Sequence, residues 1–363
     1  MNNLIQNQFE PNYVSPPGDT LKETLDILGM TQRDLAKRTG LTPKTINEII
    51  KGKNPITPET ALQFEQVLGT PASFWNNREC KYKEARARLK EQKELESKIE
   101  WLKKMPVKEM ITLGWINDYR KEKIRQLREL LKFFGVASPE AFETIWDELE
   151  VNFRISKAFI INKGALAAWL RQGLIKAMNI QCKPYDSAKL RKFLKKIRAL
   201  TVKGPDIFVP ESQKICADCG VALLFIPELP KTGISGASRW LTPNKTLIQL
   251  SLRYKTNDQL WFSFFHEAAH ILKQKKSIVF LDEKLNVDNK EESEANKFAS
   301  DVLIPPKDYK RFLKKMKCTK NSILQFAEEI GIHPGIIVGR LQHDMVIDHS
   351  HYNDLKMHLK WAD

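Results

Sequence analysis

The chain has 363 residues, enough for two or three domains, and its hydrophobic fraction of 42% is ordinary for a globular protein. It contains no run of 18 or more apolar residues, and its N-terminus lacks the basic start and apolar stretch of a secretory signal. We therefore expect no membrane span and no export. Five scattered cysteines suit a reducing cytoplasm. The net charge is +15.

Residues 1–18 are polar and contain Pro16-Pro17-Gly18, which predicts a flexible lead-in. Several short helices are expected within residues 19–80. Three of them are preceded by a threonine that can cap the first turn, and three glycines mark helix ends. The caps are Thr31, Thr42 and Thr57, and the glycines are Gly40, Gly52 and Gly69. Two helices separated by a glycine-containing turn predict a helix-turn-helix domain over 19–80.

Residues 81–200 are predicted to form a basic helical linker and scaffold, beginning with a long polar helix over 81–104. This segment carries most of the excess charge, with 28 Lys and Arg against 15 Asp and Glu. Three interpretations of the basic block stay open. It could follow a phosphate backbone, form a solvated helical face, or bind an acidic partner.

Residues 201–363 have a different pattern. Three short apolar or alternating segments predict strands at 221–226, 234–241 and 246–252, and residues 323–341 predict a helical cap. A helix with the sequence H-E-x-x-H follows the third strand directly. A small sheet followed by such a helix is typical of zinc peptidases, in which an edge strand pairs with an extended substrate.

The H-E-x-x-H motif consists of His266, Glu267 and His270 within an apolar helix. Residues four apart share a helix face, so the two imidazoles can bind one metal ion while Glu267 holds a water. The alternative is a buried helix with two satisfied histidines and a solvated glutamate. A third ligand is sought among the glutamates of residues 291–294, which could equally decorate the exposed start of a helix.

The stretch from about Gly220 to Gly339 resembles the ImmA/IrrE family of metallopeptidases. The matching segments are GVALLFIPELP, SGASRWL, FFHEAAHILK, the E-x-x-A-N-x-F-A element that begins at Glu292, and LIPP. In that family the first glutamate of E-x-x-A is the third zinc ligand, which implies Glu292 here. One departure is Ala268-Ala269, where many relatives have Leu-Gly.

This resemblance implies a Zn²⁺ ion held by His266, His270 and Glu292. The ion would activate a water, and Glu267 would accept its proton and pass it to the leaving amine. We expect the substrate to pair with the backbone of Ser235, Gly236 and Ala237. Candidates for a second group that stabilises the oxyanion are Tyr254, His333 and Arg340, each of which could instead be structural.

Residues 15–80 resemble the XRE-type helix-turn-helix, particularly HigA-like antidote proteins of toxin–antitoxin modules. The resemblance implies binding to double-stranded operator DNA, with a homodimer expected from half-site symmetry. The residues expected to meet bases at the start of the second helix are Thr42, Pro43, Lys44, Thr45 and Asn47. Those expected near phosphates are Lys44, Lys51 and Lys53, and Gln32 can contact phosphate or support the recognition helix. Alternatively, the domain only dimerises or binds protein.

The composite looks like a HigA-like regulator fused to an ImmA/IrrE peptidase. The expected fold is mainly α, with an all-α helix-turn-helix domain, a helical linker and a small α+β zincin-like domain. The expected function is a cytoplasmic DNA-binding regulator that cleaves a partner protein, either a repressor or a toxin-linked protein. Two alternatives stay open. One is a non-proteolytic antitoxin or repressor with a structural or sensory metal site, and the other is a peptidase whose helix-turn-helix recruits a similar substrate.

Overall fold

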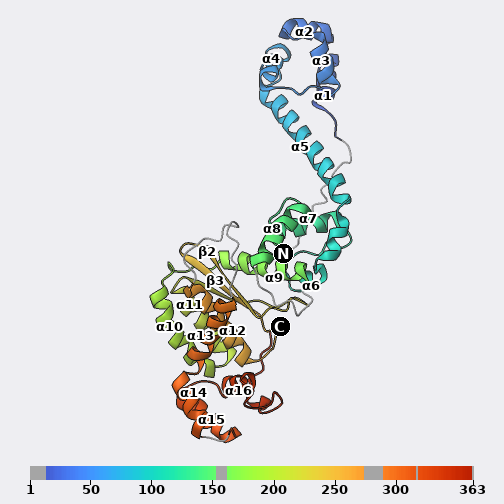
Figure 1. Cartoon of the computed structure of the whole chain (residues 1–363). Helices are drawn as coiled ribbons and strands as arrows, with labels where there is room; N and C mark the ends of the chain where they lie inside the picture. Colours follow the sequence, from blue (N-terminus) through green and yellow to red (C-terminus); the bar gives the residue numbers. More distant parts are fainter. Residues whose placement is uncertain (1–13, 153–161, 274–288, 316–317, 362–363) are drawn as a thin grey trace. The chain divides into compact units, whose positions relative to one another are not determined.

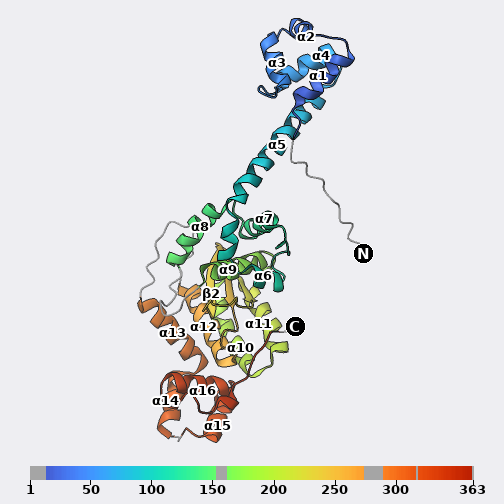
Figure 2. The same cartoon turned by 90° about the vertical axis from the view of Figure 1, so that its right-hand side faces the viewer.

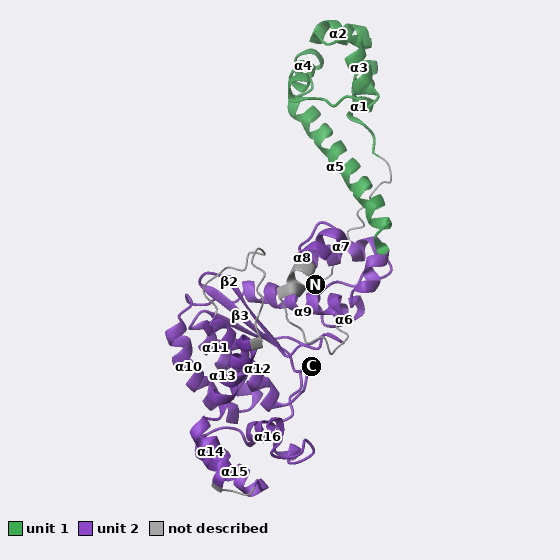
Figure 3. Ribbon diagram, in the orientation of Figure 1, with its two compact units in different colours: residues 1–99 green, residues 100–363 purple. Residues whose placement is uncertain are grey.

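The computed structural model describes residues 14–152, 162–273, 289–315 and 318–361. The chain divides into two compact units, residues 1–99 and residues 100–363 (Figure 3). Within the described ranges, unit 1 is helical and unit 2 adds a small sheet to its helices, which confirms the predicted mainly α fold with a small α+β domain. No helix in these ranges is long and apolar enough to cross a bilayer.

Unit 1 consists of short helices followed by a long one (Figure 2). They are α1 (Pro17–Ile27), α2 (Gln32–Thr39), α3 (Pro43–Ile50), α4 (Pro58–Leu68) and α5 (Ala72–Glu96). The three predicted threonine caps are confirmed. Each side chain accepts a hydrogen bond from a backbone N–H in the first turn of its helix, from Asp34, Thr45 and Thr60 respectively. These caps set where α2, α3 and α4 begin.

A compact apolar core holds the unit 1 helices together. Leu35, Ile46 and Phe64 are fully buried, and the ring of Phe64 meets that of Trp75 edge to face at 5.5 Å. The first helix begins at Pro17, two residues earlier than the sequence pattern indicates. Gly18 lies directly against α3, where an added Cβ would stand 2.2 Å from the carbonyl oxygen of Ile49. The close approach of α1 to α3 therefore requires glycine at this position.

Unit 2 begins with helices that precede the sheet. They are η1 (Ile99–Lys104, across the boundary), α6 (Val107–Thr112), α7 (Lys123–Phe134), α8 (Pro139–Asn152), α9 (Lys163–Met178), α10 (Ser187–Ala199), η2 (Leu200–Val202) and α11 (Pro205–Ala217). The helices after the sheet are α12 (Asn257–Lys273), α13 (Asn289–Leu303), α14 (Pro306–Lys315), α15 (Lys320–Ile330), α16 (Pro334–His343) and η3 (Asn353–Leu355).

The sheet contains, in the described part of unit 2, β1 (Val221–Phe225), β2 (Gly236–Thr242) and β3 (Lys245–Leu250) in the order β1-β3-β2. The three predicted strands are confirmed, with ends shifted by one or two residues. The first strand runs parallel to β3 and the second antiparallel to it, with Ser238 opposite Ile248. The central strand is β3, and β2 lies at an edge.

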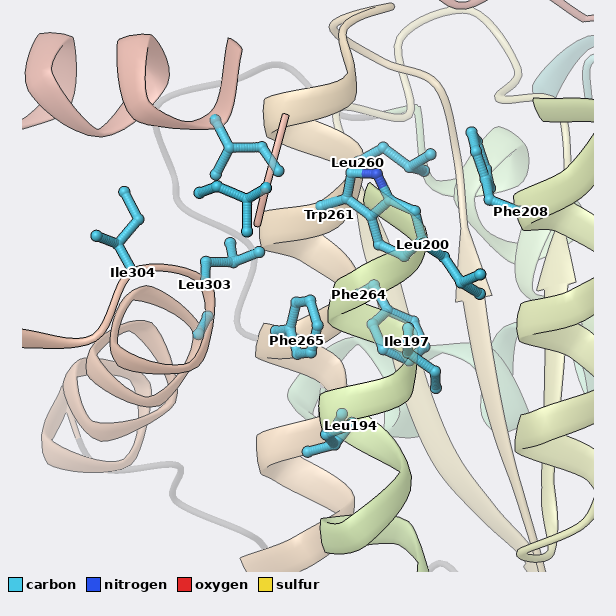
Figure 4. Close-up of a cluster of buried hydrophobic side chains, with 14 of the residues drawn as sticks. Leu194, Ile197, Leu200, Phe208, Leu260, Trp261, Phe264, Phe265, Leu303 and Ile304 are labelled. Carbon is cyan, nitrogen blue, oxygen red and sulfur yellow. The ribbon is translucent and has the colours of Figure 1, made fainter. Parts of the chain in front are cut away.

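Helices cover both faces of this sheet (Figure 1). Because strand side chains alternate, β1 and β3 contribute to two separate apolar clusters. One cluster contains α9, whose Trp169 indole donates to the carbonyl of Ile226. The other contains α10, α11 and α12, and Figure 4 shows its side chains, including Leu194, Ile197, Phe264 and Phe265. The H-E-x-x-H helix is therefore held against the sheet by a continuous core.

A helix pair completes unit 2, as the sequence predicts for residues 323–341. Gly331 ends α15 with a positive φ of 67°, and α16 begins at Pro334. The C-terminal tail then returns to the start of α12, where Asn257 and Met357 exchange hydrogen bonds of 3.0 Å. The tail and α16 thus hold the N-terminal end of α12 in place.

Two glycines in left-handed conformations predict different losses of stability. Gly220 has a φ of 84°, and a Cβ there would lie 2.3 Å from the Cα of Tyr185, whereas Gly331 has open space around it. We expect Gly331→Ala to lower the free energy of unfolding by about 1 kcal/mol through backbone strain alone. Gly220→Ala adds a backbone clash and should cost about 3 kcal/mol. Urea unfolding of the full chain measures the free energy of unfolding of both variants. Equal losses of stability would contradict the close contact between Gly220 and Tyr185.

Candidate functional site

Three potential metal ligands converge where α12 meets α13. The Nε2 atoms of His266 and His270 lie 3.0 Å apart. Glu292 places one carboxylate oxygen 3.4 Å from His266 Nε2 and the other 3.2 Å from His270 Nε2. One ligand atom from each residue lies within 4.8 Å of the other two. Two imidazole nitrogens and a carboxylate oxygen are the donor set of many catalytic zinc sites, so these residues fit a transition-metal ion.

The charges around His266 also suit a cation. Burial pushes the pKa of His266 down, but the hydrogen bond with Glu292 and the charge of Glu267 outweigh it, so the pKa stands above its ordinary value. Hydrogen bonds to both histidines hold the pKa of Glu292 well below its usual range. The two carboxylates thus favour positive charge between the rings, which a divalent metal ion supplies.

A further residue of α13 orients one ligand. The Nδ1 atom of His266 lies 2.9 Å from Oδ1 of Asn296. Because a carbonyl oxygen only accepts, the ring donates from Nδ1, and the lone pair of the neutral ring is then on Nε2, facing His270 and Glu292. The role of Asn296 was missed in the sequence, although its spacing of four residues from Glu292 places both on one helix face.

Glu267, the residue after His266 on α12, places its carboxylate between the two histidines and strand β2. Its side chain is buried, and burial raises its pKa above the ordinary value. The hydroxyl of Ser238 donates a 2.6 Å hydrogen bond to Oε2 of Glu267. Gly236 lies beside the same carboxylate, because an added Cβ would stand 3.0 Å from both Cγ and Oε1. Two alternate residues of β2 therefore enclose Glu267.

The three residues expected to pair with substrate lie at the start of β2. Ser235 comes just before the strand, and its carbonyl accepts a hydrogen bond from the N–H of Ser251. Gly236 faces Glu267, whereas the side chain of Ala237 is buried in the cluster on the opposite face of the sheet. The contact of Ser238 was missed, although residues two apart on a strand share a face and Gly236 was singled out.

The candidates for a second oxyanion-stabilising group have other partners. Tyr254 is half exposed and lies under the guanidinium of Arg253, at 4.9 Å. His333 caps α16 by accepting from the N–H of Gly335. Arg340 donates a 2.7 Å hydrogen bond to Asp344. These contacts give each residue a structural role.

The residues expected to meet DNA lie on and around α3. Thr42, Pro43 and Lys44 are exposed, and Thr45 and Asn47 are partly exposed. Ile46 and Ile49 of the same helix are buried, so α3 turns its polar face outward. The three other residues expected to meet DNA lie outside α3. Gln32 is partly exposed, and Lys51 and Lys53 are exposed.

The geometry around His266 predicts the effect of one substitution on metal affinity. Removing the amide of Asn296 frees the ring to rotate and to change tautomer, so Asn296→Ala should weaken zinc binding by about 10- to 100-fold. Competition titration with a chromophoric chelator measures this affinity. Glu291→Gln is the matched control, because Glu291 is exposed on the same helix and is not one of the three potential ligands. Equal affinities for the two variants would contradict the orienting role of Asn296.

Known proteins resemble the N-terminal part of the chain. The uncharacterized HTH-type transcriptional regulator YddM of Escherichia coli K12 is 34% identical over 61 residues, which are 17% of this chain and 65% of that protein. Virulence-associated protein I of Dichelobacter nodosus is 36% identical over 67 residues, 18% of this chain and 62% of that protein. The chain thus spans less than two thirds of either relative. A solved addiction module antidote protein of the HigA family from Coxiella burnetii is 33% identical, with a TM-score of 0.21, over 22% of this chain and 89% of that one.

Two family models match separate parts of the chain. A helix-turn-helix model matches residues 21–75, which run from α1 to the start of α5. A model of a peptidase family, described as the IrrE N-terminal-like domain, matches residues 221–342, from β1 through α16. The second match includes the three potential ligands, Glu267 and the edge strand. The chain therefore joins an N-terminal helix-turn-helix domain of the XRE type to a C-terminal IrrE-like domain of a peptidase family.

Proposed function

We propose that the protein is a DNA-binding transcription regulator, antitoxin-like in its N-terminal unit, that carries a zinc-dependent endopeptidase. The observation that carries the enzymatic part is the convergence of His266, His270 and Glu292 beside the buried carboxylate of Glu267. A purely structural metal site has no use for a free carboxylate next to its ligands, whereas peptide hydrolysis requires a base there. The substrate we propose is a partner regulatory protein.

The edge strand supports binding of an extended peptide. In the antiparallel pair of β2 and β3, Ser251 donates to the carbonyl of Ser235. Since peptide groups alternate in such a ladder, Gly236 and Ser238 turn theirs away from β3. Within the described residues β2 has no neighbour on that side. A substrate strand added there would place its peptide bonds over Glu267 and the metal ligands.

Each residue of the site has its own role in the proposed hydrolysis. A zinc ion bound at the three ligands would supply a Lewis acid that polarises the peptide carbonyl and the attacking water. Glu267 accepts the proton of the water and delivers it to the departing amine. Its raised pKa favours this shuttle, because burial brings the protonated and ionised forms closer in energy at neutral pH. Ser238 holds Oε2, so Oε1 would be the oxygen that accepts the proton.

The DNA-binding part of the proposal is based on α3. Its polar face presents Thr42, Lys44 and Asn47, and a helix in this position of a helix-turn-helix enters the major groove. Asn47 is suited to read adenine, and Lys51 and Lys53 to contact phosphates. A relative with the same domain is named a transcriptional regulator. We expect a homodimer on a two-fold symmetric operator, acting in the cytoplasm where the genome lies.

The peptidase proposal predicts that Glu267→Gln keeps zinc and fold but lowers the cleavage rate by at least about 100-fold, because the shuttle is lost. New peptide termini are identified by mass spectrometry after zinc-loaded protein is incubated with unfolded casein. Glu291→Gln serves as the charge-matched control and should cleave like the parent chain. If Glu267→Gln retains full activity, the assigned mechanism is wrong. If the parent chain cleaves no protein, the alternative function remains, namely a non-proteolytic DNA-binding regulator with a structural or sensory metal site.

The DNA proposal predicts that Thr45→Ala combined with Asn47→Ala abolishes operator protection in footprinting and leaves the zinc site intact. Because the Thr45 hydroxyl also contacts that of Thr42 at 2.8 Å, a control must separate recognition from capping. Thr60→Ala provides it, since Thr57 and Thr60 form the same pair at α4. Thr60→Ala should retain protection. Unchanged protection in the double variant would contradict the assignment of α3 as the recognition helix.

A further inference from the structure

A pocket lies between α12, α13 and α16, next to the metal ligands. Its walls come from three helices and from the residue that follows α13. They are Asp258, Gln259 and Phe262 of α12, Asn296, Ser300 and Leu303 of α13, Ile304, and Ile336, Gly339, Arg340 and His343 of α16. Neither Glu267 nor any of the three potential metal ligands lines it, so the pocket itself has no assigned role.

The pocket adjoins the potential metal site along both helices. On α12, Phe262 precedes His266 by one turn, and their ring centroids lie 6.2 Å apart. On α13, the residues Glu292, Asn296 and Ser300 follow at intervals of four and so share a face. Asn296 both lines the pocket and contacts His266. If the reacting bond of a peptide lies at the metal ligands, the side chain next to that bond can therefore reach this pocket.

The walls favour an uncharged occupant. Phe262, Leu303, Ile304 and Ile336 supply apolar surface. Two of the charged groups have counter-ions outside the pocket walls. Asp258, 4% exposed, lies 2.9 Å from the ammonium of Lys356, and Arg340 lies 2.7 Å from Asp344. His343 contacts the same Asp344 at 3.0 Å. Because Asp258 and Arg340 each have a counter-ion, a charged substrate side chain would lose its hydration without gaining a new counter-ion.

The size of the pocket limits the occupant to one side chain. The cavity measures about 160 Å³. An apolar protein cavity of about 150 Å³ is large enough to bind benzene. A leucine, methionine or phenylalanine side chain therefore fills the space, whereas glycine or alanine would leave most of it empty.

From these observations we propose that the pocket between α12, α13 and α16 is a specificity pocket that takes one large apolar side chain of the substrate, beside the bond to be cleaved. The inference rests on the proposed peptidase function, because it places the substrate peptide at the metal ligands. It adds the class of sequence that the chain selects, namely a peptide with a leucine- to phenylalanine-sized residue next to the reacting bond.

Ser300→Leu tests the pocket by filling it from the α13 wall. Ser293→Leu is the matched control, because it makes the same change at an exposed position of the same helix. In the cleavage of unfolded casein, the parent chain and Ser293→Leu should cut beside large apolar residues. Ser300→Leu should lose at least about tenfold in kcat/KM for such peptides and shift toward glycine and alanine. An unchanged cleavage pattern in Ser300→Leu would overturn the proposal.

Binding to the inactive protein separates the pocket from the chemistry. In the Glu267→Gln background, ligand-observed NMR compares N-acetyl-leucinamide, N-acetyl-phenylalaninamide and N-acetyl-glycinamide. The first two should bind and the third should not, and Ser300→Leu should abolish their binding. Equal binding of all three amides overturns the proposal. If the amides bind as expected but the parent chain cleaves no peptide, the peptidase function fails while the apolar pocket stands.

A smaller substitution tests the pocket in case Ser300→Leu does not fold. Ile336 is 3% exposed, and Ile336→Val removes one methyl group from the α16 wall. The wider pocket should raise the affinity for N-acetyl-phenylalaninamide relative to N-acetyl-leucinamide by about threefold or more. An unchanged ratio in a folded Ile336→Val chain would contradict the assigned wall.

Discussion

The packing of α12 against α13 is the contact on which the chemistry of unit 2 depends. One helix carries both histidines and the other carries Glu292, so the ligand distances of 3.2 and 3.4 Å exist only at one register of the pair. Ala299 of α13 is fully buried and shares a helix face with Glu292 and Asn296, and its small side chain allows a close approach. The same interface continues past Asn296 into the apolar pocket, so the potential metal site and the proposed specificity pocket share one structural support.

The buried carboxylate of Glu267 links α12, the helix that carries both histidines, to the sheet. A buried carboxylate is costly unless its oxygens are bonded. Here Ser238 supplies a hydrogen bond and Gly236 supplies the space. Both residues belong to β2, the edge strand to which a peptide could add. In the proposed mechanism, the binding of substrate at this edge and the position of the base would therefore both depend on two alternate positions of one strand.

Charge is distributed unequally along the chain. Residues 1–80 hold 8 Lys and Arg against 9 Asp and Glu, whereas residues 81–200 hold 28 against 15. A nearly neutral helix-turn-helix has little general attraction for the phosphate backbone, so discrimination among sequences would depend on the polar face of α3. The threonine caps at α2, α3 and α4 define where these short helices begin and thereby which side chains that face presents.

Local patterns in the sequence by themselves determined the caps of unit 1, the three strands, the H-E-x-x-H helix and the pair of helices around Gly331, because capping, alternation and helical spacing act over a few residues. The resemblance to a known family was needed to select Glu292 from three neighbouring glutamates. Only the tertiary structure placed Ser238 on Glu267, Asn296 on His266, and the wall of α16 against α12. These contacts join residues 29, 30 and about 80 positions apart, respectively, and no local rule specifies which distant side chains a fold brings together.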